Sequence, residues 1–238
     1  MDSKKRMGIA VAFVVVVGVA AAVVGTEFRG HGAAVADHQP ISDFSKLPFT
    51  ADMTIVTKIP EGHHFQPKSQ AGKTPTVTTI VYHGKMYAGP HALRTDIQMQ
   101  RGMTASVIIR YDKGVTWILT PHQGYIQTPI EERTDLLTAL RDPNAHVRKE
   151  DLGPAQVGSY ACEKYQVQVT ENSKPESGWI WVARQKDLHG FIVKAENGKT
   201  KDSVVFSNIS LVPPKPSVFD LPPGYKELTT PKQGAGGK

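Results

Sequence analysis

The chain has 238 residues and a net charge of +6, with 39% hydrophobic and 21% charged residues. This length fits one domain, or one domain with an appendage, and the moderate charge argues against a wholly disordered chain. The single cysteine, Cys162, excludes an internal disulfide and any cysteine-cluster zinc or iron–sulfur site. No run of five basic residues occurs, so we expect no nucleic-acid partner.

The N-terminus combines a basic start with a long apolar run. The tripeptide Lys4-Lys5-Arg6 precedes the apolar run Met7–Gly25, which contains no charged residue. This order is typical of a secretory signal, and the run is also long enough to span a bilayer as a helix. We therefore expect residues 1–36 to be a signal peptide or an N-terminal membrane anchor.

Two fates of this segment remain open. Ala34-Val35-Ala36 has the small-x-small pattern of a cleavage site, although it lies ten residues beyond the apolar run. Alternatively, residues 7–25 stay in the inner membrane as an uncleaved anchor. Both alternatives place the rest of the chain in the periplasm or cell envelope, because the basic end stays in the cytoplasm.

After a polar lead-in over residues 37–48, the sequence mostly follows a period of two, which predicts β-strands with two different faces. Short turns separate these strands, and Asp112-Lys113-Gly114 and Asn197-Gly198 are hairpin signals. A polar loop is expected over His63–Pro75. The predicted strands are Phe49–Lys58, Thr76–Tyr82, Lys85–Ala88, Leu93–Met99, Ala105–Tyr111, Val115–Thr120, Gly124–Thr128, Tyr160–Thr170, Gly178–Ala183, Gly190–Glu196 and Val204–Leu211.

One segment changes period in the middle of the chain. Ile130–Arg141 carries Leu136, Leu137 and Leu140 among charged residues, and Asp142-Pro143 ends it. Acidic residues in the first turn and Arg141 in the last turn suit the dipole of a helix. We predict an amphipathic helix here, with its apolar stripe against the sheet.

These elements predict a mainly β domain over residues 49–228, with one or two helices and a disordered tail over residues 229–238. Outside the N-terminal run only about 35% of the residues are apolar, which is lean for a large core. A single antiparallel sheet of this size would curve, and the helix would fill its concave side.

Four short motifs follow one another along the predicted β domain. In chain order they are G-K-M-Y-A-G-P from Gly84, L-R-T-D from Leu93, Y-D-K-G-V-T-W from Tyr111 and F-D-L-P-P-G-Y from Phe219. Their order resembles the LolA-like superfamily of periplasmic lipoprotein carriers and their uncharacterised relatives. The segment Gly158–Tyr165 is closest to the uncharacterised relatives. The resemblance implies an unclosed antiparallel β half-barrel, lidded by helices, with an apolar cavity for acyl chains. Gly89 before Pro90, where the carriers have arginine, is a departure from the pattern.

The alternation of the strands, together with this resemblance, gives a hypothetical ligand cavity. Its wall would carry the inward apolar side chains, and its lid the leucines of the predicted helix. The same inward positions could equally form an ordinary packed core. The wall residues are Val107, Ile109, Val115, Trp117, Leu119, Trp179 and Trp181, and the lid residues are Leu136, Leu137 and Leu140.

Catalytic and metal-binding signatures are missing from the sequence. There is no G-x-S-x-G or H-E-x-x-H motif, and neither G-K-T tripeptide has the first glycine of a P-loop. The nine histidines show no spacing for a closed metal site, so we expect them to be solvated. We expect Cys162 to be a small packed side chain, and no enzyme activity or cofactor.

Two functions remain. The first is an exported, noncatalytic protein that binds a lipid or an acylated, lipoprotein-like ligand in the cavity. The second is a cell-envelope interaction or sensor module without a small-molecule ligand, whose interior is filled by its own side chains.

Overall fold

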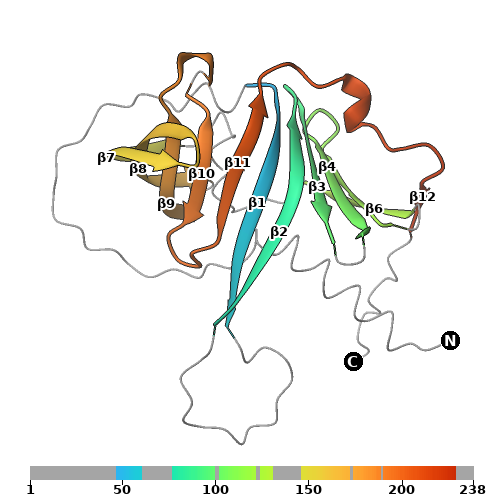
Figure 1. Ribbon diagram of the computed structural model, residues 1–238. Helices are drawn as coiled ribbons and strands as arrows, with labels where there is room; N and C mark the ends of the chain where they lie inside the picture. Colours follow the sequence, from blue (N-terminus) through green and yellow to red (C-terminus); the bar gives the residue numbers. More distant parts are fainter. Residues whose placement is uncertain are drawn as a thin grey trace, which may run out of the picture. The chain divides into compact units, whose positions relative to one another are not determined.

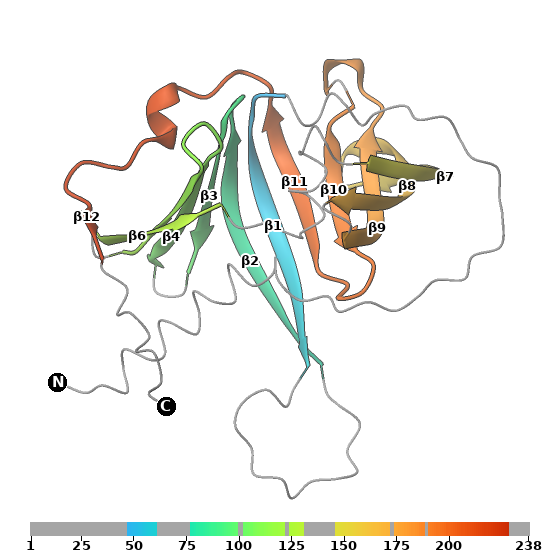
Figure 2. The same cartoon turned by 180° about the vertical axis from the view of Figure 1, so that it is seen from behind.

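The computed structural model of the chain describes residues 47–60, 77–99, 102–121, 124–130, 146–171, 174–188 and 190–228. Most of these residues lie in β-strands, which Figures 1 and 2 show from opposite sides. The described residues contain no α-helix, and the 3-10 helices η2 (Lys186–Leu188) and η3 (Pro216–Phe219) are short. No described helix is long and apolar enough to cross a membrane.

Some predicted segments lie outside the described residues. They are the apolar run Met7–Gly25 with the cleavage pattern, the tail over residues 229–238, and the predicted helix Ile130–Arg141 beyond its first residue. The one described residue of that helix, Ile130, follows a strand and is not helical.

The predicted strands are confirmed, with three differences, of which the short strand β12 near the end of the described chain is one. Thr76–Tyr82 and Lys85–Ala88 form one continuous strand, β2, and a strand that we did not predict, β7, precedes Tyr160. In chain order the strands are β1 (Phe49–Pro60), β2 (Val77–Ala88), β3 (Ala92–Gln98), β4 (Thr104–Arg110), β5 (Val115–Leu119), β6 (Gly124–Pro129), β7 (His146–Val157), β8 (Tyr160–Glu171), β9 (Lys174–Ala183), β10 (Ile192–Asn197), β11 (Ser203–Ser210) and β12 (Lys226–Glu227).

Hydrogen bonding places the described strands in the order β12-β6-β5-β4-β3-β2-β1-β11-β10-β9-β8-β7. The two ends of this order are different strands, so the described sheet is not closed. Neighbouring strands in the hairpins pair antiparallel, as the short turns predicted, whereas β12 pairs with β6 in parallel. The prediction of a mainly β, unclosed antiparallel sheet is therefore confirmed.

The described residues divide into two compact units. We call the first the Trp179 unit, which contains residues 54–60, 77–81 and 146–206. We call the second the Trp117 unit, which contains residues 47–53, 82–130 and 207–228, with the gaps given above.

The Trp179 unit has a conventional core on one side of its sheet. Tyr165 of β8 pairs with Ile180 of β9, and Val167 pairs with Gly178, so these residues share one face. Ile180 and Val167 are almost fully buried, as is Phe206 of β11. The ring of Phe206 meets that of Phe191 edge-on at a centroid distance of 5.6 Å, a favoured aromatic geometry.

The sequence of β7 explains why a strand was not predicted there. Its residues are mostly charged or polar, and Pro154 lies in the middle, where a central strand would lose a ladder hydrogen bond. However, β7 pairs with β8 alone and is an edge strand, which tolerates proline. The register shifts between Asp151 and Pro154, around Gly153 with a φ of 87°, so a bulge absorbs the irregularity.

The Trp117 unit contains a strand that is buried on both faces. Five consecutive residues of β4, Ala105–Ile109, are at most 8% exposed. A half-buried strand would instead alternate between buried and exposed positions. Strand β4 is therefore an interior strand, with packed side chains on both sides of the sheet.

Gly84 allows β2 to run unbroken beside β3. A Cβ atom built at this position would collide with the carbonyl oxygen of Asp96 and approach Met53 Cε to 2.9 Å. Only glycine lets the two strands approach this closely. The Gly84 position that we assigned to a break between two strands is a point of tight packing instead.

Candidate binding faces

The structure does not bring the predicted cavity residues together on one face. Val107 pairs with Ile118, and Ile108 between Val107 and Ile109 pairs with Trp117. Directly paired residues share a face, so Val107 and Ile109 lie on the side of the sheet opposite to Trp117. Val115 and Leu119 share the side of Trp117, since they alternate with Thr116 and Ile118.

The remaining predicted residues lie elsewhere. Trp179 and Trp181 belong to β9 of the other unit, and the lid residues Leu136, Leu137 and Leu140 lie outside the described residues. Whether any of these side chains binds a ligand stays a prediction. Three faces therefore need separate description, two in the Trp117 unit and one in the Trp179 unit.

The first is the Val107 face, which is mostly apolar and buried. The strand registers place Thr95 and Ile118, which are partly exposed, on this side of β3, β4 and β5. The buried residues on the same side are Leu93, Ile97, Ala105, Val107, Ile109 and Thr116. Each of these residues is at most 8% exposed, and none is charged.

The hydroxyl of Thr116 is an exception in this apolar setting. Thr116 is fully buried opposite Ile109, and its Oγ1 atom has no hydrogen-bond partner among the described residues. A buried hydroxyl without a partner costs about 1–3 kcal/mol of desolvation. The Val107 face therefore contains a buried polar atom without a partner, the Thr116 hydroxyl, which a bound molecule could satisfy.

The second is the Trp117 face, which is covered by the end of the described chain. We call residues 216–225 the strap. Figure 1 shows this red segment, with η3, running along the unit that holds β3 to β6. The buried cluster on this face is Ala92, Ile108, Trp117, Leu119 and Phe219, with Tyr87, Val115, Tyr125, Leu221 and Tyr225 packed against it.

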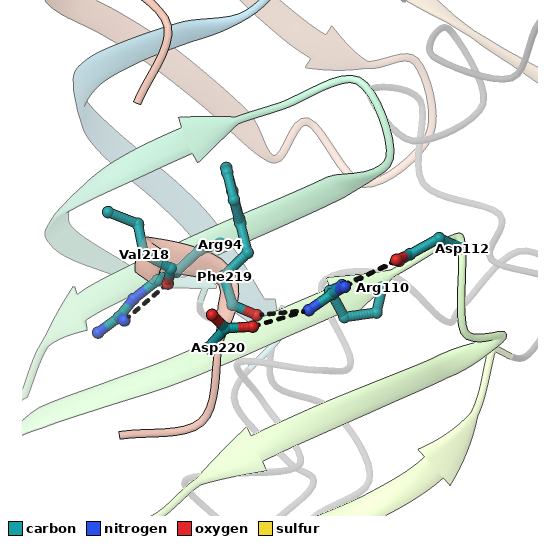
Figure 3. A network of polar contacts seen from close by, with 6 residues as sticks. All are labelled: Arg94, Arg110, Asp112, Val218, Phe219 and Asp220. Atoms are coloured by element: carbon teal, nitrogen blue, oxygen red, sulfur yellow. Dashed lines mark hydrogen bonds and ion pairs between the residues drawn. The ribbon is translucent and has the colours of Figure 1, made fainter. Parts of the chain in front are cut away.

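Two arginines attach the strap to the sheet (Figure 3). Arg94 Nη1 donates to the carbonyl oxygen of Val218 at 3.0 Å, and Arg110 Nη1 donates to that of Phe219 at 3.3 Å. Arg110 Nη1 also lies 3.1 Å from a carboxylate oxygen of Asp220. Because guanidinium groups present several donors in a fixed plane, each arginine can bind the sheet and the strap at once.

An acidic residue two positions after each arginine, Asp96 on β3 and Asp112 in the turn after β4, orients its guanidinium group. Arg94 Nε lies 2.8 Å from Asp96 Oδ1. Arg110 donates from Nε and Nη2 to the two carboxylate oxygens of Asp112, at 2.9 and 2.7 Å. This hydrogen bonding by Arg110 lowers the pKa of Asp112 from its ordinary value of 3.8 to about 2.

A pH dependence follows from the lowered pKa of Asp112. A carboxyl group whose pKa is lower in the folded state adds stability that is present above pH 3.8 and lost as the pH falls towards 2. We expect Asp112→Asn to flatten this part of the curve of unfolding free energy against pH. Urea denaturation between pH 5 and 2 measures the slope, with Asp187→Asn, at an exposed aspartate of η2, as the control. An unchanged slope in Asp112→Asn would contradict the assignment.

The third is the Trp179 face, on the side of β8, β9 and β10 opposite to the core of that unit. Trp181 pairs with Lys164 on one side and with Lys194 on the other, while Trp179 pairs with Gln166 and Glu196. Tyr165, the neighbour of Lys164 on β8, lies on the core side, because it pairs with Ile180.

Cys162 is a packed side chain, as the sequence predicted. It is fully buried, its Sγ atom lies 3.5 Å from the carbonyl oxygen of Tyr160, and burial raises the pKa of the thiol. A buried thiol with a raised pKa is a poor nucleophile. Among the described residues, no group of three or more histidine, cysteine, aspartate or glutamate side chains could hold a metal ion.

Sequence reasoning missed the strap contacts. The motif F-D-L-P-P-G-Y entered only as part of a family resemblance, although Phe219 and Tyr225 in it pack on the Trp117 face. The sequence did contain a signal for these contacts, because Arg94 and Arg110 are charged residues within predicted strands. An arginine in such a position usually serves a specific acceptor.

No protein-family model and no curated protein matches the chain. Among solved structures, the chain is similar to the crystal structure of the Mycobacterium tuberculosis lipoprotein LppX, with 13% sequence identity and a TM-score of 0.37. The match covers 68% of this chain and 86% of LppX. A likeness at this level does not show the family of the chain.

Proposed function

We propose that the protein is an exported, noncatalytic binding protein that holds a lipid or an acylated, lipoprotein-like ligand against the Val107 face. In this proposal the sheet is the wall of an unclosed half-barrel, and the apolar part of the ligand packs against Val107, Ile109 and their neighbours.

The composition of the Val107 face supports the proposal most directly. It extends over three neighbouring strands without a charged side chain, and most of its residues are buried. Each buried methylene of an acyl chain contributes roughly 0.8 kcal/mol, so a chain of moderate length gives useful affinity without polar contacts. The unpartnered Thr116 hydroxyl adds one hydrogen-bonding position for an ester or amide oxygen.

A bulky substitution on the Val107 face tests the proposal. We expect full-length protein from its own host to carry lipid, and Val107→Trp to carry at least tenfold less, because the indole takes the space of an acyl chain. Native mass spectrometry, followed by solvent extraction of the protein, measures the bound lipid. Val81→Trp, at a side chain of β2 that is 50% exposed, is the matched control and should retain the lipid.

Two further measurements make the result decisive. Circular dichroism must show that both tryptophan variants fold, and Val107→Met, which changes the volume less, should lose less lipid than Val107→Trp. The proposal is wrong if the folded wild-type protein yields no lipid and takes up no fluorescent fatty acid. It is also wrong if Val107→Trp and Val81→Trp carry equal amounts.

One observation favours the alternative, a cell-envelope interaction or sensor module without a small-molecule ligand. The Trp117 face is filled by the chain's own side chains, because Phe219 of the strap belongs to its buried cluster. If the Val107 face is filled in the same way, the protein has no room for a ligand. A folded protein without lipid, in the experiment above, would support this alternative.

A further inference from the structure

We propose that the Trp179 face is a docking surface for an anionic phospholipid bilayer. The surface consists of the half-buried Trp179 together with Lys164, Lys194 and Lys201, and Trp181, which is only 9% exposed, lies beneath the lysines as their support. All five residues belong to the Trp179 unit. The inference is separate from the ligand proposed for the Val107 face, which lies in the other unit.

The two tryptophan rings and three ammonium groups form a continuous row. Lys194 Nζ lies 4.2 Å from the centroid of Trp181, and Lys164 Nζ lies 4.9 Å from the same centroid. Lys164 Nζ also lies 6.0 Å from the ring of Trp179, and Lys201 Nζ lies 4.1 Å from that ring. Such distances are typical of cation–π contacts, so each ring is held between positive charges.

The backbone positions these groups independently of the cation–π contacts. The cross-strand register sets Lys164 and Lys194 on either side of Trp181. Lys201 comes from the loop between β10 and β11, in which Asn197 Oδ1 accepts hydrogen bonds from the backbone nitrogens of Lys199 and Thr200, at 2.8 and 3.0 Å. Lys201 itself has a φ of 60°, an uncommon conformation for a residue with a side chain.

Charge on this surface is only partly neutralised. Lys194 Nζ makes an ion pair with Glu196 at 3.1 Å. Lys164 and Lys201 have no carboxylate within ion-pair distance among the described residues. Of the other strand residues on this side, Arg148 is basic and Glu150 is acidic, by their pairing with Gln168 and Gln166. Two ammonium groups beside tryptophan rings therefore remain available to an external anion.

This combination matches the interface of an anionic membrane. The half-buried ring of Trp179 suits the headgroup region of a bilayer, which tryptophan favours because an apolar ring there meets polar surroundings. Lysine can lay its aliphatic stem along an apolar surface while its ammonium group reaches a phosphate. Near an anionic surface each lysine strengthens binding by about fivefold, so Lys164 and Lys201 together contribute roughly 25-fold.

Fluorescence quenching by brominated lipids tests the docking surface in the full chain. Because the chain contains three tryptophans, Trp117→Phe leaves only Trp179 and Trp181 as indoles. The probes are vesicles of brominated phosphatidylcholine, either alone or with an equal amount of phosphatidylglycerol. Both vesicles offer the same apolar interior to the N-terminal run, so the difference in quenching reports the effect of headgroup charge at the two tryptophans.

We expect quenching to increase when phosphatidylglycerol is present, and this increase to disappear between ~0.1 M and ~1 M salt. In Lys164→Gln/Lys201→Gln the increase should fall to less than about a fifth. The double variant Lys215→Gln/Lys226→Gln, which removes two exposed lysines of the other unit, should keep it. Lys164→Arg/Lys201→Arg should keep it as well, provided that circular dichroism shows all variants to be folded.

Three results would overturn the proposal. Equal quenching by both vesicles would show that headgroup charge has no part in the contact. An equal loss in both glutamine variants would show that only net charge matters. Protection of the indoles by polyglutamate, without an effect of phosphatidylglycerol, would assign the surface to an acidic polymer instead of a membrane.

Discussion

Phe219→Ala should lower the free energy of unfolding of the Trp117 unit by about 3–5 kcal/mol, the range for truncation of a buried phenylalanine. Phe219 is 7% exposed and is the residue of the strap that joins the buried cluster with Ile108 and Trp117. Its ring also lies against Gly89, where a Cβ atom would approach Phe219 Cε2 to 3.0 Å. Truncation leaves a cavity that the neighbouring backbone cannot easily fill.

Urea denaturation followed by the emission of Trp117 measures this loss, with tryptophans 179 and 181 changed to phenylalanine in the reference protein and in each variant. Val212→Ala, at a side chain that is 71% exposed just before the strap, should change the free energy by less than about 0.5 kcal/mol. Hydrogen exchange should also accelerate at the backbone nitrogens of β4 and β5. A loss below about 1 kcal/mol would mean that the strap adds little to the stability of the unit.

Phe206→Ala should have an effect of similar size in the Trp179 unit. Phe206 is 1% exposed on β11, and its ring contacts that of Phe191 in an edge-on geometry. The loss combines the transfer free energy of the ring, a cavity, and the aromatic contact, so we expect about 3–5 kcal/mol.

Hydrogen exchange at the backbone nitrogens of β9 and β10, together with urea denaturation, measures this second effect. Leu152→Ala, at a side chain of β7 that is 44% exposed, is the control and should be nearly neutral. The double variant of Phe206 and Phe191 should lose less than the sum of the single variants, because the two rings share one contact. Strict additivity would contradict a direct interaction between them.

Turn chemistry made much of the sheet predictable. Asp112-Lys113-Gly114 lies between β4 and β5, and Gly114 has a φ of 65°, which glycine adopts without strain. Asn197-Gly198 begins the connection between β10 and β11, although the loop is longer than a two-residue turn, since the backbone nitrogen of Asn197 donates to the carbonyl of Asp202. Local sequence therefore predicted which strands are neighbours.

The faces of the strands were harder to predict, because they depend on register. Four residues, 111–114, connect Arg110 to its cross-strand partner Val115. An odd-numbered residue of β4 therefore pairs with an even-numbered residue of β5, as Val107 does with Ile118. Because paired residues share a face, the odd-numbered residues of the two strands lie on opposite faces. Alternation within a strand does not give the register that relates Val107 to Trp117, because this register is fixed by the turn.

The Trp179 face illustrates a second limit. The spacing of Trp179 and Trp181 predicted that they share a face, and this is confirmed by their pairing with Lys164, Lys194, Gln166 and Glu196. The lysines near the two rings come from β8, β10 and the loop after β10. They approach the rings only once the sheet has formed. Long-range contacts of this kind leave no periodic signal in the sequence.

The ends of the described sheet also bear on whether the protein can pair with a second copy of itself through its strand edges. An exposed strand edge is a template for pairing with another chain, and long flat edges promote aggregation. Here β6 is paired with the two-residue strand β12, whose Lys226 and Glu227 are charged and exposed. At the other end, β7 contains Pro154 and a bulge. Both terminal strands of the described sheet are thus poor templates for pairing with a second chain.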